Sequence, residues 1–163
     1  MSQFLAIPNT ATDALLEQHP DMDFRYAKDS DLTQVKTIEQ LTSPYPWSDQ
    51  LFDESINKLL VITQKQDIIG YAVVALVAQQ AELHLIAIHP KAQSQGYGQL
   101  LLALIIESIP ASIESFFLEV RVSNCRAIRL YQRLGFEQIG ERKDYYRNGM
   151  GTEDAIIMAR ENY

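Results

Sequence analysis

Two glycines one residue apart mark a loop that could bind phosphate. The segment IAIHPKAQSQGYGQLL, residues 86–101, joins an apolar, strand-like run to an apolar, helix-like run through Gly96 and Gly98. A loop leading into a helix presents free N–H groups and the positive end of the helix dipole, and glycine lets a bulky anion approach. No Gly-Lys-Ser/Thr follows as in a P-loop, and Leu101 stands where a dinucleotide fingerprint has its third glycine. A simple tight turn is the alternative.

A carboxylate stands inside an otherwise apolar segment. Glu119 lies in FFLEVRV, residues 116–122, which the β-branched and aromatic residues predict to be a strand. Burying a carboxylate is costly without a partner, so Glu119 either accepts protons in a site or pairs with Arg121 on the same strand face.

Two further side chains could act from a single helix. Asn124 and Tyr131 are seven residues apart, about two helical turns, and therefore share a face. Asn124 could instead serve as the helix N-cap, and Tyr131 could be a core aromatic residue. Cys125 and the three histidines show no spacing typical of a catalytic thiol or a metal site, so we expect neither.

The elements that position these residues can be predicted from periodicity. Apolar residues one turn apart predict a helix over 97–108, and residues 115–122 form the next strand. A strand, a helix and a strand in succession indicate a parallel pair. A helix from Asn124 to Leu134, ended by Gly135, and strands at 136–143 and 152–159 complete this half.

The first half of the chain predicts a strand, two helices and a meander. Residues 24–27 form a strand, and Leu32, Val35, Ile38 and Leu41 recur at helical spacing after Asp29-Ser30-Asp31. Ser48 can cap a second, short helix. Residues 59–64, 68–78 and 82–88 then form three antiparallel strands. The expected fold is α+β, with about seven strands in a mixed sheet and four helices.

Length and charge limit the classes of function. The 163 residues suit one domain, which we place at residues 23–163, and residues 1–22 lack periodicity and are expected to form a loosely held extension. A net charge of −7 disfavours nucleic acid and favours a cationic partner. The longest apolar run has 11 residues, too short to cross a membrane, and a single cysteine without a secretory signal suits the cytoplasm. The oligomeric state stays open.

Several motifs together resemble a known family. Gln93-Ser94-Gln95-Gly96-Tyr97-Gly98 resembles the Gln/Arg-x-x-Gly-x-Gly/Ala motif of the GNAT acetyltransferases, which holds the pyrophosphate of acetyl-CoA. Within that family, the RimI group of N-terminal acetyltransferases of ribosomal proteins is similar in four segments, in the same order: PYPWSDQLF (44–52), LIAIHP (85–90), LEVRVSNCRAIRLYQRLGF (118–136) and YYRNGMGTEDAIIMA (145–159). The resemblance runs from about residue 23 to residue 160 and implies the GNAT fold.

The resemblance also implies roles for individual residues. Glu119 would be the general base, and Tyr131 the acid that protonates the departing thiolate and also a cofactor contact. Acetyl-CoA would be the co-substrate, without a metal. Its contacts would be Ile86, Ala87, Ile88, Gln93, Ser94, Gln95, Gly96, Tyr97, Gly98, Gln99 and Asn124. The acceptor peptide would lie between two loops that carry Tyr45 and Trp47, and Tyr145 and Tyr146.

The chemistry of the acceptor favours a protein N-terminus. Deprotonation at pH 7 costs about 1.4 kcal/mol for an α-amino group and about 4.6 kcal/mol for a lysine, so a carboxylate base suits the first. In the RimI group the target is the N-terminal alanine of a small-subunit ribosomal protein, and the acidic chain would favour a basic peptide. The alternatives are a GNAT enzyme for small amines or antibiotics and a module that binds acetyl-CoA without catalysis.

Overall fold

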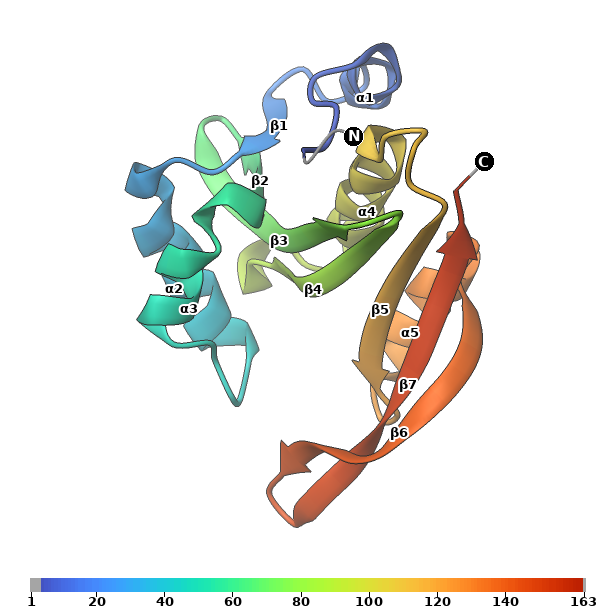
Figure 1. Cartoon of the computed structure of the whole chain (residues 1–163). Helices are drawn as coiled ribbons and strands as arrows, with labels where there is room; N and C mark the ends of the chain where they lie inside the picture. Colours follow the sequence, from blue (N-terminus) through green and yellow to red (C-terminus); the bar gives the residue numbers. More distant parts are fainter. Residues whose placement is uncertain (1–3, 163) are drawn as a thin grey trace.

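A single mixed sheet organises the protein. The structure, a computed structural model, describes residues 4–162. Over these residues seven strands form one sheet in the order β1-β2-β3-β4-β5-β7-β6 (Figure 1). The pair β4·β5 is parallel and the other neighbours are antiparallel. The strands are β1 (Met22–Tyr26), β2 (Leu59–Gln64), β3 (Asp67–Val77), β4 (Gln80–Ile88), β5 (Ser115–Arg121), β6 (Glu137–Asn148) and β7 (Gly151–Glu161). The predicted α+β class and parallel pair are confirmed.

Helices cover both faces of the sheet. One core cluster joins the sheet to α4 and α5, and a second joins it to α2 and α3. Figure 1 shows α2 and α3 beside the first strands and α5 behind β5. The described helices are α1 (Thr10–Leu16), α2 (Leu32–Thr42), α3 (Asp49–Glu54), α4 (Tyr97–Ser108) and α5 (Cys125–Arg133). Four helices were expected, and α1 is the additional one.

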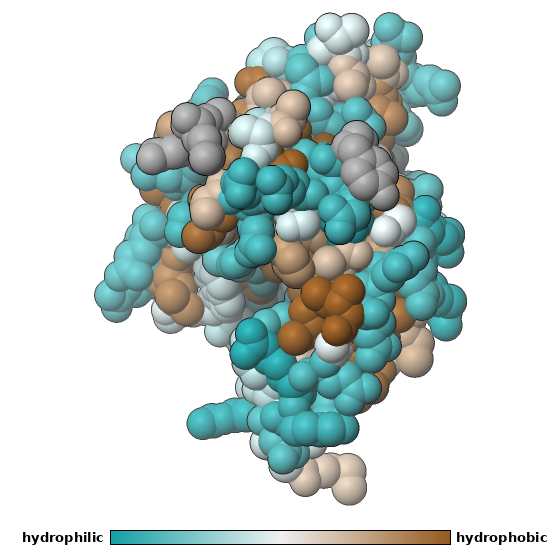
Figure 2. Space-filling view, turned by 45° about the vertical axis from the view of Figure 1, so that its right-hand side comes forward, coloured by the Kyte–Doolittle hydropathy of each residue, from teal (hydrophilic) through white to brown (hydrophobic). Residues whose placement is uncertain are grey.

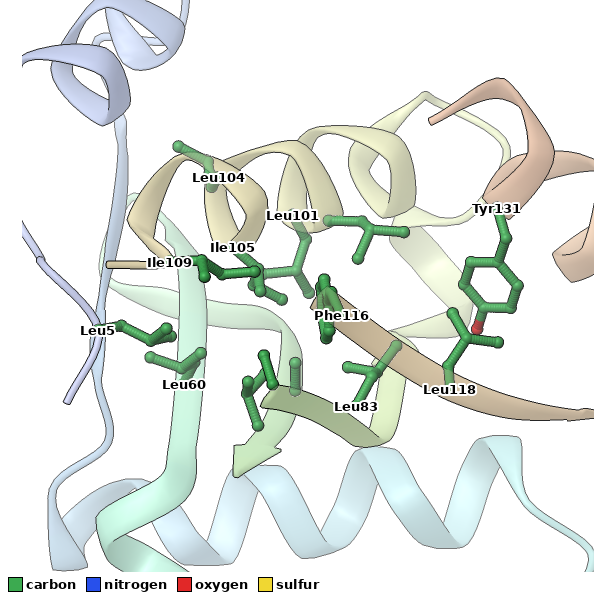
Figure 3. Close-up of a cluster of buried hydrophobic side chains, with 14 of the residues drawn as sticks. Leu5, Leu60, Leu83, Leu101, Leu104, Ile105, Ile109, Phe116, Leu118 and Tyr131 are labelled. Atoms are coloured by element: carbon green, nitrogen blue, oxygen red, sulfur yellow. The ribbon is translucent and has the colours of Figure 1, made fainter. Parts of the chain in front are cut away.

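The larger cluster forms the centre of the domain. Leu101 and Ile105 of α4 are fully buried and point toward the sheet, on the side where Leu60 and Phe116 lie (Figure 3). Leu104 is also fully buried, but it points away from these two residues (Figure 3). Burying side chains of this size stabilises the fold by about 2 kcal/mol each before conformational entropy is subtracted. The core therefore fixes α4, whose first residues carry the glycine loop.

One predicted core position is wrong. Leu41 was expected to share the apolar stripe of α2 with Val35 and Ile38, but its side chain is 57% exposed. Three-residue steps drift around a helix with 3.6 residues per turn, so after three such steps Leu41 lies opposite Leu32. Glu39 is buried instead, at 3% exposure.

The described part of the N-terminal segment packs on the domain instead of extending from it. Leu5 is buried in the larger cluster beside Ile109 (Figure 3), and its N–H donates to the Tyr26 hydroxyl over 2.9 Å. The side chain of Asn9 caps α1 and donates to the Glu107 carbonyl of α4 over 3.0 Å. Residues 1–3 lie outside the described residues.

One face of the molecule is mainly polar. Hydrophilic residues dominate the face seen in Figure 2, with one compact hydrophobic group in its lower half. Of the described helices, none has the length and apolarity that crossing a membrane requires.

Candidate active site

Strands β4 and β5 separate in the middle of the sheet. Their parallel pairing joins Gln80–Leu83 to Ser115–Leu118 and ends there. Beyond it, Leu85–Ile88 remain paired with β3 and Glu119–Arg121 with β7, so the two halves of the sheet diverge (Figure 1). Divergence leaves the β4 edge at Ile86–Ile88 with backbone groups that a ligand can pair with.

A bulge in β4 coincides with the divergence. Val73 pairs with Leu85 and Val74 with Leu83, so His84 is the extra residue. A bulge shifts the alternation of side chains by one position. Leu83 therefore packs in the larger cluster, whereas Leu85 packs against the smaller one.

A cleft of about 980 Å³ occupies the region between the diverging strands. All six of the predicted catalytic and acceptor residues line it, together with Ile86 and Asn124. They are Glu119, Tyr131, Tyr45, Trp47, Tyr145 and Tyr146. This cleft is not lined by Ala87, Ile88 or Gln93–Gln99. In the chain these residues come after Ile86, at the end of β4 and around the glycine loop that leads into α4. The structure thus separates the predicted residues into a cleft and a loop.

The loop has the features of a phosphate site. Gly96 is the N-cap of α4, with φ of +85°, and no side chain caps this helix end. A Cβ built at Gly96 meets nothing within 4 Å, so open space lies beside the loop. The guanidinium of Arg126 donates to the Ser94 hydroxyl over 3.2 Å and adds positive charge. An uncapped helix N-terminus, open space and a nearby cation suit a pyrophosphate.

Some side chains of the loop have structural roles. The Gln93 amide donates to the Ile88 carbonyl over 3.0 Å, and the Gln95 amide donates to the Lys91 carbonyl over 3.3 Å. Tyr97 packs against the larger core cluster and lies edge-on to His19. These contacts shape the loop, and its backbone N–H groups are what it offers to an anion.

Glu119 faces the cleft with a partner that we did not predict. Its carboxylate forms an ion pair with the Arg142 guanidinium, in which Oε1 lies 2.8 Å from Nε, and its side chain is 27% exposed. It also accepts a hydrogen bond from Tyr145, which raises the pKa of that phenol. The alternative pairing of Glu119 with Arg121 is wrong, since Arg121 binds Glu153. Glu119 is therefore held in place and still reachable from the cleft.

Tyr131 places a protonated phenol at the cleft. Its side chain is 6% exposed, and burial, followed by the influence of Tyr146, raises its pKa to about 12. The ring lies edge-on to Phe136 at 5.9 Å, and Figure 3 shows its hydroxyl directed toward Leu118 of β5. Tyr131 is thus both a core aromatic residue and a hydrogen-bond donor available at the cleft.

Asn124 is the N-cap of α5, which was one of the two roles that the sequence left open for it. Its Oδ1 accepts from the Ala127 N–H over 3.2 Å. Asn124 also lines the cleft, so the cap does not remove it from a ligand's reach.

Aromatic residues from two separate segments line the cleft. Tyr45 and Trp47 lie in the loop between α2 and α3, where Trp47 packs on Phe52 at 5.6 Å. Tyr145 and Tyr146 lie on β6 with ring centroids 5.0 Å apart. We call these two pairs the loop lip and the hairpin lip.

The cleft contains charged groups that sequence reasoning missed. Glu39 accepts a hydrogen bond from the buried Tyr71 hydroxyl, and Glu82 lies 3.1 Å from His84. With Glu119, the lining has three carboxylates and three guanidinium groups, those of Arg121, Arg142 and Arg147. The alternation of Glu119 and Arg121 on one strand face could have indicated Arg121. The sequence carries no local pattern that indicates the contacts between distant segments, such as Tyr71 with Glu39 or Arg142 with Glu119. Within residues 4–162 no group of His, Cys, Asp and Glu could hold a metal ion.

The fold and the cleft define a family. Residues 26–136 match the acetyltransferase (GNAT) family, to which the chain belongs. It is therefore an N-acetyltransferase that uses acetyl-CoA, as the resemblance implied.

Proteins similar to this chain within the family include alanine N-acetyltransferases of a ribosomal protein. The ribosomal protein bS18-alanine N-acetyltransferase of Escherichia coli K12 is 37% identical over 134 residues, covering 80% of this chain and 90% of that one. The enzyme of that name from Haemophilus ducreyi is 37% identical over 136 residues, covering 80% and 94%. The crystal structure of the E. coli ribosomal-protein-S18-alanine N-acetyltransferase superposes with a TM-score of 0.81 at 33% identity, covering 86% and 94%. A Salmonella typhimurium protein solved with its cofactor acetyl-CoA shares the fold, with a TM-score of 0.72 at 19% identity over 88% and 95%.

Proposed function

We propose that the protein transfers the acetyl group of acetyl-CoA to the N-terminal amine of a ribosomal protein that begins with alanine. The observation that carries the proposal is the meeting of Glu119, Tyr131 and both aromatic lips in one cleft, where β4 and β5 diverge. Relatives that cover four fifths of the chain are named for this reaction on bS18. A ribosomal substrate also supports the cytoplasm as the place of action.

The proposed reaction is direct transfer. The amine nitrogen attacks the thioester carbonyl, the new C–N bond forms, and the C–S bond breaks. Glu119 accepts the proton that the amine loses, directly or through water, and Tyr131 donates a hydrogen bond to the departing sulfur. An α-amino group needs only about 1.4 kcal/mol for deprotonation at pH 7, which a carboxylate can assist.

The proposed binding mode uses backbone on one side and aromatic rings on the other. The pantetheine arm would pair with the free edge of β4 at Ile86–Ile88, and the pyrophosphate would bind the N–H groups of Ser94–Gln99. Asn124 would contact the cofactor. The peptide would enter between the loop lip and the hairpin lip.

The preference for a basic peptide rests on the whole chain. The net charge is −7, whereas the cleft lining has equal numbers of carboxylates and guanidinium groups. Attraction would therefore act over the approach of the peptide and would weaken as salt is added.

Mass spectrometry of acetyl transfer tests the proposal. Three acceptors are compared: a basic peptide that begins with alanine, its N-terminally blocked copy that contains lysine, and spermidine. We expect only the free alanine peptide to gain an acetyl group. Transfer to spermidine alone would instead establish a small-amine enzyme, and binding of acetyl-CoA without any transfer would establish a binding module.

Variants test the role of Glu119. Glu119→Gln should lower kcat about 100-fold, because general base catalysis contributes about that much. Glu107→Gln, an exposed carboxylate on α4, is the matched control and should keep wild-type activity. Equal activity of both variants would remove Glu119 from the mechanism.

A further inference from the structure

Arg121 lies at the point where the two lips approach each other. It is the last residue of β5, on the same strand face as Glu119, two residues before it. The centre of its guanidinium lies 4.5 Å from the ring centroid of Tyr146 and 5.6 Å from that of Tyr45. Both distances lie within the range of attraction between a cation and an aromatic ring.

The same guanidinium is anchored to the hairpin by hydrogen bonds. Its Nη1 donates to the Arg147 carbonyl over 2.7 Å and to the Glu153 carboxylate over 2.9 Å. The side chains of Arg121 and Glu153 are 26% and 14% exposed, so water screens this ion pair only in part. Hydrogen bonds from Ser123 and Arg121 hold the pKa of Glu153 below its ordinary value.

These contacts connect three segments that are distant in the chain. Tyr45 belongs to the loop after α2, Arg121 to the sheet, and Tyr146, Arg147 and Glu153 to the β6–β7 hairpin. The β5 strand is fixed by pairing with β7 over its whole length. A guanidinium on a fixed strand that contacts both lips sets the distance between them.

We propose that Arg121 is a positioning residue that holds the loop lip and the hairpin lip together around the acceptor peptide. The role rests on the proposed function, since it concerns the peptide side of that cleft. Arg121 acts through Tyr45 and Tyr146 and contributes to binding of the acceptor. It does not act on acetyl-CoA, whose proposed contacts lie on β4, the glycine loop and α5.

Arginine suits this role better than lysine. The planar guanidinium can lie against two rings and still direct N–H groups at a carbonyl and a carboxylate. A lysine ammonium supplies the charge but not the planar surface. Retaining the charge alone is therefore expected to restore only part of the effect.

Steady-state kinetics with both substrates varied test the proposal. Arg121→Gln should raise the KM of the alanine peptide about tenfold, with the KM of acetyl-CoA and kcat within threefold of wild type. Arg121→Lys should raise the peptide KM about threefold to fivefold. Arg133→Gln, an exposed arginine in the last turn of α5, is the matched control and should leave both KM values unchanged.

Three kinetic results would overturn it. They are an unchanged peptide KM in Arg121→Gln, a rise of both KM values by the same factor, and full recovery in Arg121→Lys. The second would mean that Arg121 supports the fold in general.

Hydrogen exchange provides a measurement that needs no acceptor. In Arg121→Gln, exchange should accelerate in residues 43–48 and in residues 144–152 together, and it should be unchanged in the core of α4. Unaltered exchange in either lip would overturn the role of Arg121. If the wild-type protein acetylates spermidine and not the peptide, the proposed function fails. The hydrogen-exchange experiment would still show whether Arg121 holds the loop lip and the hairpin lip together.

Discussion

Replacing Tyr131 by phenylalanine tests how the departing sulfur is stabilised. Burial raises the pKa of Tyr131 to about 12, whereas a thiol has a pKa of about 8.5. Complete transfer of the proton from tyrosine to a thiolate is therefore uphill by roughly 3.5 pKa units, or about 4.8 kcal/mol. We expect Tyr131 to donate a hydrogen bond to the sulfur in the transition state without losing its proton.

The expected loss of activity follows from that hydrogen bond. A hydrogen bond to a charged group contributes about 1.5–3 kcal/mol, which corresponds to a 10-fold to 150-fold change in rate. Tyr131→Phe should lower kcat within this range and leave the KM of acetyl-CoA within a few fold. Release of the CoA thiol, followed with a disulfide reagent, measures the rate. Tyr26→Phe, which removes a phenol bonded to the Leu5 N–H away from the cleft, should retain wild-type kcat.

The same substitution has a defined effect on stability. A raised pKa favours the protonated phenol in the folded state, so this contribution is fully present below the unfolded pKa of about 10. It is lost as the pH rises from about 10 to about 12, and two pKa units amount to about 2.7 kcal/mol. The free energy of unfolding of wild type should therefore fall relative to Tyr131→Phe by about 1.4 kcal/mol between pH 9 and pH 11.

Two results would refute this reasoning. A kcat of Tyr131→Phe within threefold of wild type would show that the hydroxyl does not assist the reaction. A stability difference in urea that stays constant from pH 9 to pH 11 would show that the pKa of Tyr131 is not raised.

Substitutions at three further positions test the loop, the helix cap and the ion pair of the first strand. Gly96→Ala should raise the KM of acetyl-CoA about tenfold, because φ of +85° costs alanine about 1 kcal/mol and its Cβ enters the open space; an unchanged KM would contradict a phosphate site. Asn124→Ala should lower the free energy of unfolding by about 1 kcal/mol, because it removes the side-chain oxygen that caps α5 at the Ala127 N–H. Asn124→Asp keeps this cap. A higher KM for acetyl-CoA in Asn124→Asp would therefore report the contact with the cofactor alone. Asp31→Asn should cost about 2 kcal/mol at pH 7 in urea unfolding, because it weakens the charge-assisted hydrogen bonds that Asp31 accepts from the Arg25 guanidinium. The Arg25 guanidinium also holds the pKa of Asp31 below its ordinary value, so this contribution is present above about pH 4 and is lost at lower pH. A difference that stays constant with pH would contradict the pairing.

Local patterns predicted most of the secondary structure. The helix at Tyr97–Ser108 has the expected bounds, and Ser48 caps α3 as expected. Caps and periodicity depend on residues within a few positions of one another, so the sequence expresses them directly. The short α1 was not predicted, because seven residues carry little periodicity and tertiary contacts stabilise them.

The candidate site was predictable to the extent that it is local or shared with a family. Two glycines at the start of a helix left an anion site and a simple tight turn as alternatives, and the family motifs supplied the phosphate role of the loop and the roles of Glu119 and Tyr131. What the side chains contact was not predictable. Gln93, for instance, donates to a strand carbonyl, which its place in the motif does not indicate.

Tertiary structure alone decided how the site is assembled. The sheet order β5-β7-β6 places β6 only two strands from β5, so the side chain of Arg142 on β6 reaches Glu119 on β5 across β7. Arg121 contacts both lips because β4 and β5 separate beside it. The bulge at His84 arises from the pairing of two strands. Periodicity and caps follow from neighbours in the chain, whereas these contacts join residues on different strands and loops, and only the packed sheet brings such residues together.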